Sequence, residues 1–186
     1  MAFGGSDGGK AQRFRAAALP HLDDVYTLAH YLLRNPTDAE DAAQECYLRA
    51  FRHFETFRGG PIKPWLLAIL RNVCRAEYAR RGTVVAMNGD DLDAAENCAE
   101  GLWSDGEQTP EQSVLARLDS ESVQRLIAQL PDQFRETLVL REINELSYRE
   151  IAEVVAVPVG TVMSRLARAR ALLREAWIAE EKGSRS

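Results

Sequence analysis

Residues 147–174 decide the fold, and they read SYREIAEVVAVPVGTVMSRLARARALLR. Ser147 and Glu150 have the spacing of a capping box, in which each side chain accepts a hydrogen bond from a backbone N–H at a helix start. That helix must end near Val155, because Pro158 cannot continue it. Proline does fit the first turn of a following helix. The stretch therefore predicts a short helix, a tight turn and a second helix.

The second of these helices has two distinct faces. Its buried stripe consists, at helical spacing, of Val162, Leu166, Ala169 and Leu173. The opposite arc carries Thr161, Ser164, Arg165 and Arg168. A charged helix face is often only solvated, but such faces mix both signs, and residues 154–174 contain four arginines and no acid. Arginine suits guanine edges and phosphates in the DNA major groove, so the pattern favours a DNA-binding helix-turn-helix.

Length and composition indicate an all-α protein with two small helical domains. The 186 residues are 46% apolar, enough for one modest core or two small ones. No apolar run is long enough to span a membrane, and the N-terminus lacks the apolar core of a signal peptide, so we expect a cytoplasmic protein without membrane insertion. Cys46, Cys74 and Cys98 lack the spacing of a zinc site or a disulfide framework. We expect no metal and no cofactor.

A net charge of −5 is unusual for a DNA-binding protein, but the negative charge is concentrated in one segment of the chain. Residues 82–116 contain eight acids and no Lys or Arg, so this segment's −8 leaves a net +3 for the rest of the chain. The segment also contains glycines and no helical periodicity, which predicts a flexible linker over residues 83–109. It is either a solvated tether or an acidic strand that occupies a basic channel, with Trp103 as its apolar anchor.

Three helices are predicted between the N-terminus and this linker. Apolar residues recur at helical spacing from Leu22 to Leu33, and Asn35-Pro36 ends that run. Thr37 and Glu40 suggest a second capping box, which opens a helix with an acidic outer face. A glycine-rich, aromatic and cationic loop follows at residues 57–63, and Pro64 suits the first position of a third helix. Such a loop, beside a basic helix face, can stack and hold bases that have left the duplex.

Three stretches together resemble an extracytoplasmic-function (ECF) sigma factor of the sigma-70 family: DAEDAAQECYLRAFRHFETFRGG (38–60), PWLLAILRNVCRAEYARR (64–81) and the stretch from LPDQFRETLV to ARARALL (130–173). The resemblance covers nearly the whole chain, with its motifs in order. It implies a promoter-recognition subunit that binds core RNA polymerase, reads the −10 and −35 elements and promotes DNA opening. The domains it implies are a disordered residues 1–13, sigma domain 2 at 14–82, the acidic linker at 83–109, sigma domain 4 at 110–178 and a tail at 179–186.

The resemblance also implies three sets of site residues. The −35 element would be bound by Arg149, Thr161, Met163, Ser164, Arg165 and Arg168. The −10 element would be bound and opened by Phe57, Arg58, Lys63, Arg71, Asn72, Arg75, Arg80 and Arg81. The core-polymerase interface would consist of Asp38, Asp41, Gln44, Glu45 and Arg49.

The partners implied are the clamp coiled coil and the flap of core RNA polymerase, promoter DNA and an anti-sigma factor. The acidic linker would thread the active-site and RNA-exit channels. Three positions differ from the residues that are usual in the family. Met163 stands where relatives often have Lys or Arg, Ala167 stands where they often have an aromatic residue or His, and Ala76 stands where many have Asp. The sequence therefore leaves the promoter consensus open.

Two other functions remain as alternatives from the residues alone. A stand-alone helix-turn-helix regulator would use a similar C-terminal lobe, but the acidic helix and basic aromatic loop suit polymerase and opened DNA better. An enzyme is disfavoured, because His21, His30 and His53 lie far apart and no phosphate-binding glycine loop occurs.

Overall fold

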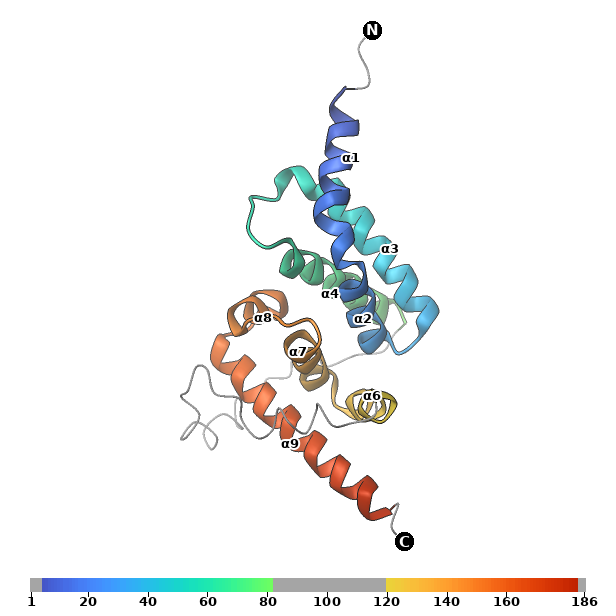
Figure 1. The fold of residues 1–186 in the computed structure, drawn as a ribbon, viewed down its shortest axis with the longest axis vertical. Helices are drawn as coiled ribbons and strands as arrows, with labels where there is room; N and C mark the ends of the chain where they lie inside the picture. The colour runs from blue at the N-terminus through green and yellow to red at the C-terminus, as the bar shows by residue number, and fades with distance from the viewer. Residues whose placement is uncertain (1–4, 82–119, 184–186) are drawn as a thin grey trace.

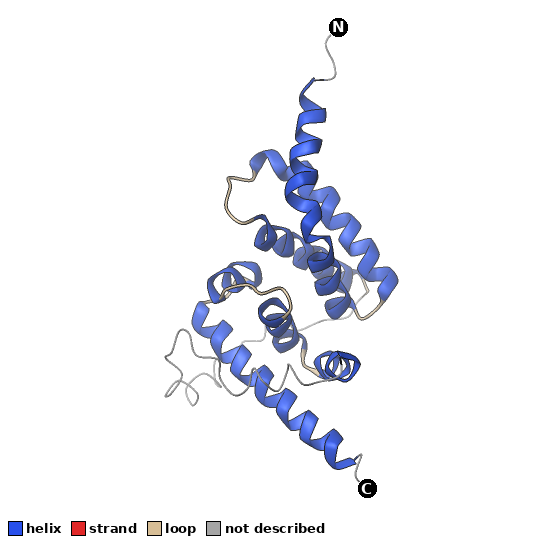
Figure 2. Cartoon of the chain, in the orientation of Figure 1, coloured by secondary structure: helices blue, strands red, loops and turns tan. Residues whose placement is uncertain are grey.

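The computed structural model describes residues 5–81 and 120–183, and all regular secondary structure in these ranges is helical (Figures 1 and 2). The N-terminal lobe contains α1 (Gly5–Ala18), α2 (Leu22–Leu33), α3 (Pro36–His53) and α4 (Ile62–Arg80), with short 3-10 helices at Leu19–His21 and Phe54–Thr56. The C-terminal lobe contains α6 (Ser120–Gln129), α7 (Asp132–Glu142), α8 (Tyr148–Val155) and α9 (Val159–Gly183). The prediction of an all-α chain with two helical lobes is confirmed.

The predicted acidic linker lies outside the described residues, as do residues 110–119 of the predicted second domain. Within the two described ranges, no helix combines the length and the apolar composition needed to cross a membrane.

The N-terminal segment differs from its prediction. The sequence predicted disorder for residues 1–13, because glycines disfavour a helix, whereas Gly5–Ala18 is helical. Phe14 explains the difference, since its buried ring packs edge-to-face on three rings of α3 and the 3-10 helix after it. Their centroids lie 6.2, 5.4 and 5.3 Å away, on Tyr47, Phe51 and Phe54. Tertiary contacts therefore outweigh the weak helix propensity of this segment.

Two helix starts also differ from the sequence prediction. The side chain that caps α3 is Asn35, whose Oδ1 accepts a hydrogen bond from the Asp38 N–H at 3.1 Å, and not Thr37. Pro36 takes the first position of the helix, where no backbone donor is needed. Helix α4 begins at Ile62, so Pro64 lies within its first turn and not at its first residue.

The two lobes share one continuous apolar core. In the N-terminal lobe, fully buried core residues include Leu28 of α2, Ala39 of α3 and Leu66 of α4. In the C-terminal lobe they include Leu140 of α7, Ile151 of α8 and Val162 of α9. Figure 1 shows α7 and α8 beside the N-terminal lobe, and both touch it: α7 contacts α2, and α8 contacts α4. The Asn144 side chain, between α7 and α8, donates a hydrogen bond to the Asp24 backbone oxygen of α2 at 3.1 Å. The lobes are therefore packed together in this structure.

Candidate DNA and polymerase interfaces

Helices α8 and α9 form the predicted helix-turn-helix. The capping box at Ser147 and Glu150 is complete: the Ser147 N–H donates to Glu150 Oε2 at 2.8 Å, and the Glu150 N–H donates to Ser147 Oγ at 3.3 Å. Ala156 ends α8 in a left-handed conformation with φ 55°, and the Val157 N–H donates to the Ala152 carbonyl oxygen. This turn redirects the chain into α9 and so sets the angle between the two helices.

The buried stripe of α9 is as predicted, because Val162, Leu166, Ala169 and Leu173 all lie in the core. Of the polar residues on the opposite arc, Arg168 is exposed, and Thr161 and Ser164 are half-buried. Arg149 is exposed on α8, and Met163 is half-buried on α9. Neither Arg149 nor Arg168 forms an ion pair with a described residue, so both guanidinium groups are available to a ligand.

Arg165 differs from its prediction, since it was expected to project outward and is buried. Its side chain, 7% exposed, lies close enough to Glu136 of α7 and Arg71 of α4 for their charges to act on it. Burial lowers the pKa of the Arg165 guanidinium, and the Glu136 carboxylate opposes this shift. Arg165 is therefore buried near charged groups of α7 and α4, which no pattern within α9 could reveal.

The loop before α4 has the geometry that its glycines allow. Gly59 and Gly60 have φ of 90° and 98°, a region that side-chain-bearing residues rarely adopt. Phe57 stacks at a tilt on Trp65, with ring centroids 4.9 Å apart, and Arg58 is exposed beside it. The loop thus presents an aromatic pair next to a cation, a surface on which a base can stack.

Two cations predicted to bind the −10 element are paired inside the structure. Lys63 Nζ lies 2.8 Å from Asp24 Oδ1, in an ion pair that leaves it half-buried. Arg71 was expected on an exposed polar face of α4, yet it is only 3% exposed, and its Nε donates to Glu136 Oε1 at 2.7 Å. Asn72 is exposed and Arg75 half-buried, so the polar side of α4 is only partly open. Asp24 and Glu136 were not singled out from the sequence, because their partners lie 39 and 65 positions away along the chain.

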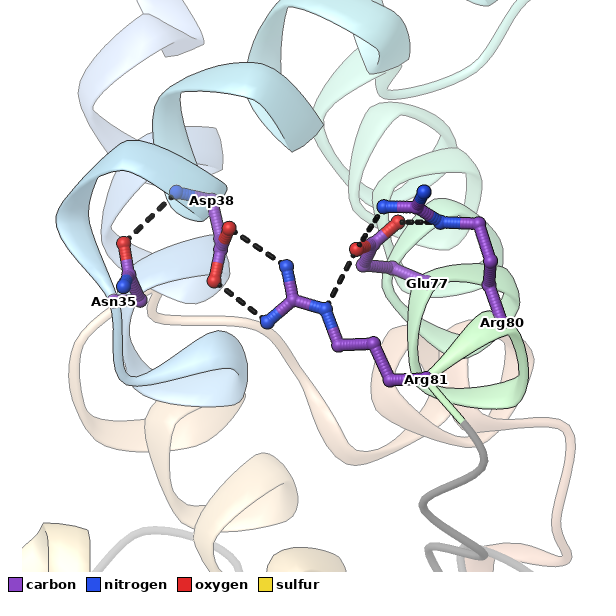
Figure 3. Close-up of polar contacts among 5 residues, drawn as sticks. All are labelled: Asn35, Asp38, Glu77, Arg80 and Arg81. Carbon is purple, nitrogen blue, oxygen red and sulfur yellow. Dashed lines mark hydrogen bonds and ion pairs between the residues drawn. The ribbon is translucent and has the colours of Figure 1, made fainter.

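A network of ion pairs occupies the end of α4 (Figure 3). Arg81 donates from Nη1 and Nη2 to the two oxygens of Asp38, at 2.8 and 2.7 Å, and from Nε to Glu77 Oε1 at 2.7 Å. Arg80 donates to both oxygens of Glu77, at 3.0 and 2.7 Å. The cations of Arg80 and Arg81 lower the pKa of Glu77 to about 2, and Arg81 lowers the pKa of Asp38. The network connects the start of α3 to the end of α4 and engages two arginines predicted to bind DNA.

The predicted polymerase face of α3 is partly occupied in the same way. Asp38 is paired with Arg81, and Arg49 Nε donates to Glu45 Oε1 at 2.6 Å, whereas Asp41 and Gln44 are exposed.

Beside Gln44 lies an apolar surface that the sequence did not reveal. Two adjoining hollows on α1, α2 and α3 share Leu22, Gln44 and Tyr47. Leu19, Leu22 and Leu48 there are 50, 47 and 53% exposed. Leu48 could have been identified from the sequence as an apolar residue on the polar side of its helix. The exposure of Leu19 and Leu22 depends on how α1 and α2 meet, which the sequence does not show.

The described residues contain no group of three or more His, Cys, Asp or Glu side chains arranged to hold a metal ion. Cys46 and Cys74 are buried, and burial raises the pKa of each thiol to about 12.

Comparisons with known proteins place both lobes in one family. Residues 18–84 match the model of sigma-70 region 2, and residues 120–173 match that of sigma-70, region 4. The ECF RNA polymerase sigma factor SigW of Bacillus subtilis is 34% identical over 162 residues, which cover 83% of this chain and 83% of SigW. The ECF RNA polymerase sigma factor SigE of Mycolicibacterium smegmatis is 34% identical over 159 residues, which cover 83% of this chain but only 58% of that longer relative.

A solved structure is similar over most of the chain. It is that of the sigma factor RpoE in complex with the anti-sigma factor NepR from Bartonella quintana, with a TM-score of 0.66 and 25% sequence identity. The similarity covers 88% of this chain and 96% of that one. It therefore includes parts of both lobes.

Proposed function

This chain belongs to the sigma-70 family, in its ECF class, and from that membership we propose that it is an alternative sigma factor that directs core RNA polymerase to promoters. The observation that carries the proposal is the order of two sigma-70 regions in one chain, the second of which ends in a helix-turn-helix with exposed arginines. A stand-alone regulator would not need region 2. The proposal assigns binding and DNA opening to the chain, and no chemical step.

The −35 element is the ligand proposed for α8 and α9. Arg168 projects from α9 with its guanidinium exposed, as bidentate recognition of a guanine edge requires. Arg149, exposed near the start of α8, is suited to a phosphate of the backbone, which fixes the register of the motif without reading sequence. Thr161 and Ser164 are the remaining polar groups of this face, and Met163 offers an apolar contact.

The −10 element is the ligand proposed for the loop at residues 57–61 and for α4. Separating and flipping bases costs a few kcal/mol, which stacking and phosphate contacts must offset. Phe57 and Trp65 provide the aromatic surface, and Arg58 the adjacent cation. We assign Asn72, which is exposed, and Arg75, which is half-buried, to the strand that these residues would hold. Lys63 and Arg71 can join them only by exchanging a carboxylate partner for DNA. Arg80 and Arg81 are also paired with carboxylates, but their side chains remain exposed.

Core polymerase is the partner proposed for α3 and the apolar surface beside it. Protein interfaces typically combine a desolvated apolar centre with a polar rim. Leu19, Leu22 and Leu48 supply the apolar centre, and Asp41 and Gln44 supply the rim. The partner suited to this surface is an amphipathic helical element that carries basic residues, such as the clamp coiled coil.

A binding measurement tests the docking surface. Leu48→Asp places a charge in the apolar centre, and we expect it to weaken association with purified core polymerase at least about fivefold, the size of effect seen at interface anchors. The matched control is Ile178→Asp, which changes an exposed apolar residue near the end of α9. Equal affinities of the two variants for core polymerase would refute this assignment, provided that circular dichroism shows the wild-type helix content in both.

A further inference from the structure

Helix α1 lies outside the part of the chain that matches sigma-70 region 2. That match begins at residue 18, whereas α1 runs from Gly5 to Ala18. Figure 1 shows the first turns of α1 extending past the rest of the N-terminal lobe, and Phe14 fixes its second half on α3 and the 3-10 helix that follows. Membership of the family therefore gives α1 no role, and a role must come from its own residues.

The charged side chains of α1 that the structure describes are all positive. Residues 8–18 contain Lys10, Arg13 and Arg15 and no acid. Lys10 and Arg13 are three positions apart and share one flank of the helix, whereas Arg15 lies about 200° around the helix from Arg13. A face that is only solvated usually carries both signs. The composition of α1 therefore suits a negatively charged ligand.

Two contacts hold the flank of Lys10 and Arg13 next to the loop at residues 57–61. Lys10 Nζ lies 4.8 Å from the centre of the Phe51 ring. Arg13 Nη2 lies 3.3 Å from Glu55 Oε1 in the 3-10 helix that leads into the loop. Glu55 is two residues before Phe57, and two residues span at most about 7 Å. The cationic flank of α1 therefore lies beside the aromatic surface to which a base is assigned.

Both cations are accessible without a rearrangement of the fold. The Arg13 and Glu55 side chains are 68% and 58% exposed, and exposed ion pairs of this kind contribute little stability. A DNA phosphate offers Arg13 the same charge and the same type of acceptor as the carboxylate. Lys10 forms no ion pair with a described residue, so its ammonium donors are also available. Exchange of Glu55 for a phosphate is therefore easy, in contrast to the exchange that buried Arg71 would require.

The loop at residues 57–61 leaves room for a strand. A side-chain carbon added at Gly59 or Gly60 would meet no atom within 4 Å. Arg58, between Phe57 and these glycines, is exposed. The backbone of a strand whose base stacks on Phe57 can therefore pass the loop, where Arg58 supplies a cation within it and Arg13 a cation next to it.

We propose that Lys10 and Arg13 of α1 bind phosphates of the opened DNA strand, next to the base held by the loop at residues 57–61. These contacts extend the −10 surface without reading sequence. The inference rests on the proposed function, which assigns the loop to the −10 element. The ligand is single-stranded DNA and not a duplex, because an aromatic surface stacks bases that have left their partners.

The test is binding of the full chain to a fluorescent single-stranded oligonucleotide of thymidines at low salt. A homopolymer suffices because phosphate contacts carry no sequence information. The double variant Lys10→Gln, Arg13→Gln should bind at least about threefold more weakly, since each exposed ion pair contributes up to about fivefold. The slope of log affinity against log salt concentration should become shallower by about 1.4, because each phosphate contact contributes about 0.7 on a single strand. A change of packing alone would leave this slope unaltered.

Arg15→Gln is the matched control, because it removes an exposed cation from the other flank of the same helix. Its affinity and its salt slope should stay close to those of the wild type, and circular dichroism should show the same helix content in all three chains. The proposal is overturned if the double variant has the affinity or the salt slope of Arg15→Gln. It is also overturned if the double variant loses as much affinity for a fully paired duplex, the ligand assigned to α8 and α9.

Glu55→Gln provides a second arm that leaves both cations in place. It removes the carboxylate that Arg13 must exchange for a phosphate, so affinity for the oligonucleotide should rise about twofold. The rise should be smaller in a chain that also carries Arg13→Gln, where only the net charge changes. Equal rises in the two backgrounds would show that Arg13 does not contact the strand. Transcription by the wild-type chain with core polymerase tests the proposed function separately, and a chain that supports transcription but fails these comparisons loses only the α1 site.

Discussion

Arg168→Ala should change which promoters are chosen and leave the protein intact. The Arg168 side chain is exposed on α9 and forms no ion pair with a described residue, so its removal should alter the free energy of unfolding by less than about 0.5 kcal/mol. At the DNA, loss of one bidentate contact to a base pair should cost about 1 to 3 kcal/mol of discrimination, or roughly 5- to 150-fold in relative affinity. The loss should fall on one position of the −35 element.

The assay is competitive binding of the chain, assembled with core polymerase, to duplexes that carry each of the four base pairs at every −35 position. Arg149→Ala is the comparison, because Arg149 is assigned to a phosphate and its loss should weaken all duplexes about equally. An Arg168→Ala profile parallel to the wild type's at every position would refute the base-reading role. So would an identical change of preference in the two variants.

Ser147→Ala removes the hydroxyl that accepts a hydrogen bond from the Glu150 N–H in the capping box. It should lower the free energy of unfolding by about 1 kcal/mol, measured by urea denaturation. An unchanged denaturation midpoint and slope would contradict this prediction. Glu77, whose pKa Arg80 and Arg81 hold at about 2 instead of 4.5, contributes stability that is complete above about pH 5 and is lost as the pH falls toward 2. The stability difference between wild type and Glu77→Gln should therefore shrink from pH 6 to pH 3, and a constant difference would show that the ion pairs are not the cause. Duplex affinity should fall linearly with the logarithm of salt concentration, since phosphate contacts release counterions; a salt-independent affinity would exclude those contacts.

Local patterns in the sequence predicted the helix-turn-helix well, because the signals that form it are themselves local. Ser147 and Glu150 cap a helix three residues apart, and Pro158 must follow its end. The stripe from Val162 to Leu173 reports burial directly through its helical spacing. The two helices could therefore be predicted from residues 147–174 alone.

Contacts between distant residues account for what the sequence could not predict. The helix at Gly5–Ala18 depends on where Phe14 meets the rings of α3 and the 3-10 helix after it. Arg81 and Asp38 are 43 positions apart, and Arg71 and Glu136 are 65 apart. A helical wheel places Arg71 and Arg165 on polar faces, but it cannot show that helices distant in the sequence bury them. The DNA and polymerase roles of the individual residues remain predictions.

The most direct test of the proposed sigma-factor function is in vitro transcription by purified core RNA polymerase, with and without this chain, on a library of promoters randomised at the −10 and −35 elements. We expect the chain to enable initiation from a subset of the library, and the selected sequences to share two separate elements. Failure of the chain to join core polymerase, or to start RNA synthesis at any sequence, would contradict the proposed function.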